Sequence, residues 1–222
     1  MTAIASDNDA VDSALRLVVA LTLAAVDGAD GVSVSLQRHG RLTTVAASDR
    51  TISSMDAEQY AAGEGPCVDA SVNGRWFHVE SLEDETRWPT FTPRAQQLGI
   101  NAILSNPLLA RDRPVGALNM YARTIDAFAV KDRDLASVFA SEASVILTDA
   151  GMAVSEDQFA RRIHEALRGR EVIAQAQGAI MARDGVGEDN AYTTLRRSSQ
   201  ATGTPLRQCA QRMLDSTRRL HG

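Results

Sequence analysis

The stretch AILSNPLLARDRPVGALNMYA, residues 102–122, decides the fold class of this sequence. It holds two apolar runs, 102–110 and 114–122, separated by the polar turn Arg111–Asp112–Arg113. Apolar runs on either side of a polar turn are typical of two paired β-strands. The stretch therefore predicts a hairpin whose two strands are buried.

A second hairpin is predicted nearer the N-terminus. In GVSVSLQRHGRLTTVAA, residues 31–47, apolar side chains alternate with polar ones before the turn signal at His39–Gly40. Such alternation is the period of a half-buried strand. Two hairpins predict one antiparallel sheet.

Helices are predicted around this sheet. Apolar residues recur every three or four positions over residues 9–27 and 132–147, which predicts an amphipathic helix at each end of the sheet-forming region. Shorter elements are expected between them: helices over 53–61 and 91–99 and a strand over 75–79. The fold class is thus α+β, an antiparallel sheet flanked by the first and last helices, in a domain of residues 1–150.

The rest of the chain reads as all-α. A helical linker over 151–167 continues into a long helix that ends near residue 182, and helices over about 188–201 and from 205 onward complete a three-helix bundle in residues 168–222. Apolar residues spaced by seven along the long helix predict a contact with a second helix, and hence a homodimer. That row consists of Phe159, Ala166, Ile173 and Ile180.

Composition limits the classes of protein. The chain has 222 residues, 44 % of them hydrophobic, and a net charge of −5. No apolar run is long enough to span a bilayer, and two distant cysteines favour a reducing compartment, so a cytoplasmic protein without a membrane partner is expected. Residues 155–222 carry 11 basic and 8 acidic side chains, whereas residues 1–154 carry 12 basic and 20 acidic ones. This asymmetry indicates two parts with different partners.

GEGPC, residues 63–67, is the least ordinary stretch of the first domain. Pro66 can begin a helix at Cys67, and a thiol at a helix N-terminus can be reactive. The alternative is that Cys67 is a small buried residue beneath a tight loop. No metal site or cofactor is predicted, and the acidic run at 83–85 reads as a solvated loop rather than a cation site.

Aromatic residues between the hairpins can either wall a ligand pocket or anchor the core. We assign a possible pocket to Cys67, Trp76, Phe77, Trp88 and Tyr121.

Gly178 lies inside the long predicted helix, where glycine costs roughly 0.5–1 kcal/mol relative to alanine. We expect it to let the shorter helices pack closely, with Ala176 and Met181 shaping the bundle beneath. Tyr192 and Arg196 are spaced i, i+4, with Arg197 beside them. An aromatic ring next to guanidinium groups favours single-stranded RNA loops, although a solvated helix face is the alternative.

Three motifs in the helical part match one known family. They are R-x-x-I-x-x-A-Q-G-x-I-M from Arg170 to Met181, A-Y-x-x-L-R-x-x-S from Ala191 to Ser199, and L-x-x-C-A from Leu206 to Ala210. This region, 168–214, resembles the ANTAR domain of bacterial transcription antitermination regulators. The resemblance implies a dimer that binds paired hairpin loops in nascent messenger RNA, and it adds Arg170 and Gln177 to the candidate RNA-binding residues Tyr192, Arg196 and Arg197. Gln177 stands where the family often has lysine.

The first domain resembles a second family. The matching pieces are GEGPC at 63–67, RWP at 87–89, NPL at 106–108 and GALNMY at 116–121. They are similar to the GAF domains that precede ANTAR domains in actinobacterial regulators. The resemblance implies a sensory domain with a small-molecule ligand that the sequence does not identify.

Two other functions compete with an RNA-binding regulator that is not an enzyme. A three-helix end can house a DNA-binding helix-turn-helix, although residues 201–205 fit its short turn poorly. The other is a GAF-fold thiol reductase, which a single cysteine in the domain disfavours.

Overall fold

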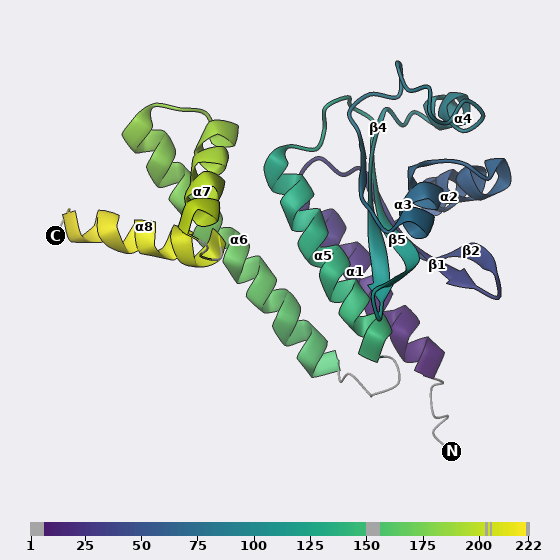
Figure 1. Cartoon of the computed structure of the whole chain (residues 1–222), viewed down its shortest axis with the longest axis horizontal. Coiled ribbons are helices and arrows are strands. Elements are labelled where there is room, and N and C mark those ends of the chain that lie inside the picture. The colour runs from purple at the N-terminus through teal and green to yellow at the C-terminus, as the bar shows by residue number, and fades with distance from the viewer. Residues whose placement is uncertain (1–6, 150–155, 203, 205, 221–222) are drawn as a thin grey trace. The chain divides into compact units, whose positions relative to one another are not determined.

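The stretch 102–122 forms the predicted hairpin within a five-stranded antiparallel sheet. The computed structural model describes residues 7–149, 156–202, 204 and 206–220. The chain divides into two compact units between Phe159 and Ala160. The sheet belongs to the first unit (Figure 1).

The strands of the sheet have the order β2-β1-β5-β4-β3. They are β1 (Gly31–Arg38), β2 (Arg41–Ala47), β3 (Phe77–Val79), β4 (Ala102–Ala110) and β5 (Arg113–Ala122). Both predicted hairpins are confirmed, because β1 pairs with β2 and β4 pairs with β5, each antiparallel. The pairing of β1 with β5 joins the two hairpins into one sheet.

Both hairpins turn through two residues that have positive φ. These are His39 and Gly40 in one and Arg111 and Asp112 in the other, with φ between 51° and 75°. Positive φ at both central residues matches the right-handed twist of the flanking strands. The polar residues between the apolar runs therefore form the tight turns that the sequence predicted.

Helices cover both faces of the sheet (Figure 1). On one face lie α1 (Asp7–Ala25) and α5 (Val130–Asp149). On the other lie α2 (Arg50–Ala62) and α3 (Pro66–Asn73), with the short α4 (Thr92–Gln97) beyond them. The sheet is thus buried on both sides, which makes polar side chains on its inner strands conspicuous.

The second unit is made of three helices, α6 (Glu156–Asp184), α7 (Glu188–Thr202) and α8 (Leu206–Leu220). Their apolar faces meet in one small core, as the helical spacing predicted. Its buried members are Ala176, Ile180, Ala191, Leu195, Cys209 and Ala210. Among the described residues, no helix is long and apolar enough to cross a membrane.

Part of the seven-residue row on α6 is internal to this core, contrary to its expected role in a dimer contact. Ile180 is buried and Ile173 packs against the core. These two residues are committed to α7 and α8 of their own chain. Phe159 and Ala166 lie outside the residues whose side chains are described.

The expectation for Gly178 was wrong. It is exposed, and a Cβ built on it would meet no described atom within 4 Å. Ala176 and Ile180 face the core, so the residue midway between them points away from it. Met181 is also on the surface, with 37 % of its area exposed, while Ala176 is fully buried as predicted.

Candidate sensor site and nucleic-acid interface

A cluster of polar side chains lies buried between the sheet and helices α2 and α3. Its base is a row across three strands, because Ser33 on β1 pairs with Asn119 on β5, which pairs with Ser105 on β4. All three side chains are buried. Directly paired residues share one face of a sheet. The row therefore faces the same layer as Phe77, the partner of Ser105 on β3.

Asp56 on α2 stands at one end of this cluster and is completely buried. Ser33 donates to its Oδ1 at 2.9 Å, and Thr44 on β2 donates to its Oδ2 at 2.7 Å. The phenol of Tyr121 on β5 donates to Oδ1 at 2.5 Å. One carboxyl group thereby joins α2 to three strands.

Burial raises the pKa of Asp56 to about 6, and the three hydroxyl hydrogen bonds oppose this rise only in part. Loss of water disfavours the charged form of a carboxyl group, whereas donors to its oxygens favour it. In the part of the chain that the structure describes, all its hydrogen-bond partners are hydroxyls and none is a cation. Asp56 therefore exchanges a proton close to neutral pH.

Cys67 lies at the other end of the cluster, at the start of α3. Its thiol donates to Ser35 Oγ at 3.3 Å, and Asn119 Nδ2 lies 3.2 Å from the sulfur. Tyr60 also donates to Ser35, at 2.6 Å. Ser35 thus links α2 and α3 to β1.

The environment of Cys67 favours the unreactive of its two predicted roles. The thiol is fully buried, and burial, with the charge of Asp56 as the second cause, raises its pKa. A raised pKa removes the thiolate, which is the nucleophilic form. Pro66 begins the helix as predicted, and Gln59 Oε1 accepts from the Cys67 backbone amide at 2.8 Å. A side-chain amide thus satisfies that backbone N–H.

The candidate pocket residues are only partly brought together. Cys67 and Tyr121 both belong to the polar cluster. Phe77 and Trp88 are core residues that pack edge to face, with ring centroids 6.0 Å apart. Trp76 is 56 % exposed and does not line this interior, because it alternates with Phe77 at the edge strand.

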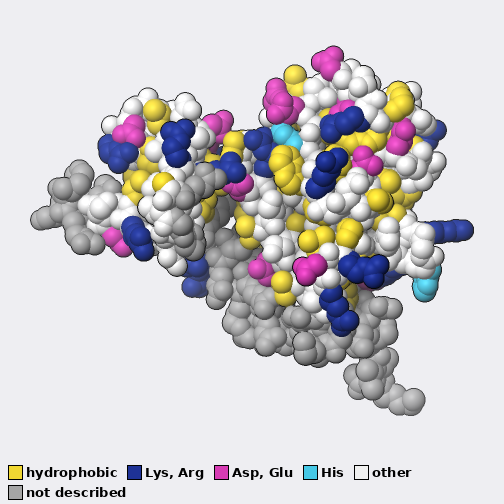
Figure 2. Space-filling view, viewed as in Figure 1, with side chains coloured by type: hydrophobic (Ala, Val, Ile, Leu, Met, Phe, Trp, Pro, Cys, Tyr) yellow, Lys and Arg dark blue, Asp and Glu magenta, His cyan; other side chains and the backbone are white. Residues whose placement is uncertain are grey.

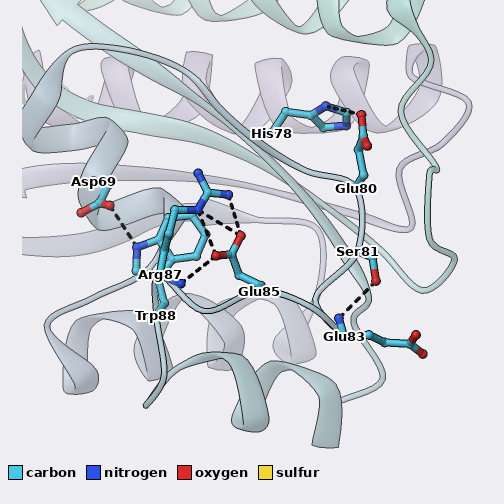
Figure 3. A network of polar contacts seen from close by, with 8 residues as sticks. All are labelled: Asp69, His78, Glu80, Ser81, Glu83, Glu85, Arg87 and Trp88. Carbon is cyan, nitrogen blue, oxygen red and sulfur yellow. Dashed lines mark hydrogen bonds and ion pairs between the residues drawn. The ribbon is translucent and has the colours of Figure 1, made fainter.

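Figure 3 shows why Trp88 is a structural anchor. Its indole Nε1 donates to Asp69 on α3 at 3.0 Å, and the Arg87 guanidinium lies 4.4 Å above its ring. Arg87 is held in turn by the Glu85 carboxylate, and this hydrogen bond lowers the pKa of Glu85. The loop after β3 is thereby fastened to α3.

This network also uses one carboxylate of the acidic run at 83–85. Among the described residues, no group of three or more His, Cys, Asp or Glu side chains is placed to hold a metal ion. The close-up also shows Glu83 bonded through its backbone to Ser81 and His78 beside Glu80 (Figure 3).

In the helical unit, the two predicted RNA-binding arginines of α7 are exposed, whereas the tyrosine beside them is buried. Arg196 and Arg197 on α7 are exposed, and Figure 2 shows basic side chains on the surface of this unit. Tyr192 is only 3 % exposed, so the expectation that its ring lies on the surface was wrong. The buried face of α7 is wide enough to include Tyr192 next to Ala191, which leaves Arg196 at its border.

Gln177 is also inside, with 5 % of its area exposed and no partner for its Nε2 among the described residues. The side chain of Arg170 lies outside the described ones. The two exposed arginines are therefore the members of the predicted RNA set that the structure places on the surface.

Several site residues escaped the sequence analysis: Ser33, Ser35, Asp56, Tyr60 and Asn119. One feature of the sequence could have indicated them, namely a polar residue within an otherwise apolar strand. Asn119 within the apolar run of β5 is an example.

A layered sheet with a buried polar cluster, followed by a separate three-helix unit, defines a protein built of two units. The sequence model of the GAF domain family matches residues 8–148, and that of the ANTAR domain matches residues 161–214. The chain belongs to the GAF domain family and carries an ANTAR domain after it. An ANTAR domain implies RNA binding in transcription antitermination, and a GAF domain implies a sensory role, so this architecture favours a regulator over an enzyme.

Solved structures agree on the fold of the first unit. A type II free methionine-R-sulfoxide reductase from Thermoplasma acidophilum is 14 % identical, with a TM-score of 0.54 over 65 % of this chain and 96 % of its own. A domain of a putative two-component sensor histidine kinase from Sinorhizobium meliloti is 19 % identical, with a TM-score of 0.54 over 69 % and 99 %. The GAF region of a putative membrane protein from Geobacter sulfurreducens is 16 % identical, with a TM-score of 0.52 over 64 % and 95 %.

At such identities these neighbours establish the fold alone. No curated protein matches the chain significantly.

Proposed function

We propose that this protein binds hairpin loops in nascent messenger RNA and thereby prevents a terminator from forming. The observation that carries the proposal is the exposed pair Arg196–Arg197 on a bundle that matches the ANTAR domain. Guanidinium groups contact phosphates and stack on unpaired bases. Arg170 stays in the proposed RNA-binding set, whereas Gln177 leaves it because its side chain is buried.

Tyr192 has a different place in this proposal. Because its ring is buried, it supports α7 from within and holds the arginines in position. Its loss should reduce RNA binding through the fold of the bundle rather than through lost stacking.

Crosslinking in the cell of origin tests the proposal. Transcripts recovered with the wild-type protein should carry two adjacent hairpins that overlap a terminator, and a protein with both Arg196→Ala and Arg197→Ala should recover few of them. A folded wild-type protein that recovers no RNA, or recovers only duplex DNA, would overturn the proposal.

The GAF unit is proposed to sense a small molecule. The buried cluster around Asn119 is the polar interior that such a molecule would meet, because Asn119 Oδ1 and Ser105 Oγ have no hydrogen-bond partner among the described atoms. A ligand that binds only the folded unit raises its melting temperature, so a thermal-shift screen of metabolites tests this role.

We further propose that the protein acts in the cytoplasm as a homodimer. Support comes from the GAF–ANTAR architecture. Light scattering at micromolar concentration tests the dimer, and a mass equal to one chain would contradict it.

A further inference from the structure

Asp56 is joined to the sheet by hydrogen bonds that depend on its ionisation. As a carboxylate it only accepts, and it accepts from Ser33, Thr44 and Tyr121. A protonated carboxyl group carries a donor, and the oxygen that holds the proton is a poorer acceptor. After protonation of Asp56, at least one of these three hydrogen bonds must therefore reverse its direction.

The geometry provides a path for the reversal. If Oδ2 takes the proton, it donates to Thr44 Oγ1, which lies 2.7 Å away. Thr44 must then turn its own hydrogen elsewhere, and the phenol oxygen of Tyr60 is 2.9 Å from it. Tyr60 in turn donates to Ser35, which also receives the Cys67 thiol. A proton bound to Asp56 thus changes the hydrogen bonds along a chain of hydroxyl groups that extends from α2 to the first turn of α3.

We propose that Asp56 is a proton-sensitive latch, which fastens α2 to the sheet through three hydroxyl donors when ionised and reverses the Thr44 hydrogen bond when protonated. The latch is a property of the GAF unit that does not depend on RNA binding.

The surroundings of Asp56 leave it as the group that titrates near neutrality. Among the described residues, the ionisable groups on which the charge of Asp56 acts are Tyr60 from its own helix, Cys67 from α3 and Tyr121 from β5. Burial raises the pKa of all three, so each stays neutral across the range in which Asp56 changes its charge. The remaining neighbours, on β1 and β2, are the hydroxyls of Ser33 and Thr44.

The chain's tyrosines make the latch observable. Tyr60 and Tyr121 form hydrogen bonds within the cluster, and Tyr192 lies in the helical unit. We would label the phenol Cζ carbons of the full chain with ¹³C and follow their NMR shifts as a function of pH. The signals of Tyr60 and Tyr121 should move together with one midpoint near the pKa of Asp56, about 6. The signal of Tyr192 should stay constant.

Three variants assign the step. Asp56→Asn should abolish it, whereas Glu58→Gln should leave it unchanged, because Glu58 on the same helix pairs at the surface with Arg94. Thr44→Val removes one donor to the carboxylate and should raise the midpoint by about half a pH unit, roughly a threefold gain in proton affinity. Thr44→Val keeps the proposal testable if Asp56→Asn does not fold.

Three results would each overturn the latch. They are constant Tyr60 and Tyr121 signals in the wild type through this range, an unaltered step in Asp56→Asn, and an unaltered midpoint in Thr44→Val.

Discussion

Removing a carboxyl group from water is unfavourable unless partners compensate for the lost hydration. Asp56 has three hydroxyl partners and full burial, and the balance leaves its pKa at about 6, above the ordinary value of 3.8. The folded state therefore binds this proton more tightly than the unfolded state. Its contribution to the free energy of unfolding is greatest below the ordinary pKa and is lost as the pH rises through the folded one.

This linkage predicts a pH effect on stability. Between about pH 4.5 and pH 7.5, Asp56 should lower the free energy of unfolding of the GAF unit by about 2 kcal/mol. Urea unfolding at the two pH values measures it, with Asp56→Asn as the comparison. The decline should be smaller by this amount in Asp56→Asn, and an equal decline in both proteins would show that Asp56 is not its source.

Gly178 leads to a prediction of increased stability. A methyl group added there would meet open space, and the residue has a helical backbone. Gly178→Ala should therefore stabilise the helical unit by roughly 0.5–1 kcal/mol. Thermal unfolding followed by circular dichroism is the measurement, and a lower melting temperature would mean that a neighbour occupies this face.

Among the elements, α7 depends on its buried tyrosine. Tyr192→Ala removes a large side chain from the bundle and should destabilise it by about 3–5 kcal/mol. Thr193→Ala, which changes the exposed neighbour, should have little effect. Helicity and melting temperature distinguish the two variants. Normal stability of Tyr192→Ala would return the ring to the surface role that the sequence predicted.

The elements also show where sequence reasoning succeeds. The two hairpins were predictable because apolar alternation and polar turns are local signals that need no tertiary information. The polar cluster was not, because its members come from α2, α3 and four strands and meet only in the folded domain. Ser33 and Ser35 alternate with valines, a pattern that predicts a solvated face, but α2 and α3 cover it. Tyr192 was wrongly placed on the surface. Its i, i+4 spacing from Arg196 shows that the two residues share one side of the helix, but it does not show where the buried face of that helix ends.

At the scale of the whole molecule, the two units should unfold as separate transitions. Each has its own core, and the division falls within α6. Scanning calorimetry should resolve two transitions, with Tyr192→Ala lowering one and Asp56→Asn shifting the other. A single transition that both variants move by the same amount would show one cooperative unit instead.

RNA binding is the central claim for the whole protein, and the arginine pair makes it quantitative. Each lost phosphate contact should lower the slope of log affinity against log salt by about 0.7 for single-stranded RNA. Arg196→Ala with Arg197→Ala should therefore weaken binding and flatten its salt dependence. Arg183→Ala is the matched control, because Arg183 is an exposed arginine of the same unit that lies outside the proposed RNA-binding set.

The most direct measurement is a competition titration of the wild-type protein, in which a two-hairpin RNA and a duplex DNA of the same sequence are offered at several salt concentrations. We expect the RNA to bind more tightly at every salt concentration. The double arginine variant, with unchanged helicity, should lose most of this preference, and Arg183→Ala should keep it. Equal or tighter binding of the duplex DNA, or a double arginine variant that binds the RNA like wild type, would contradict the account.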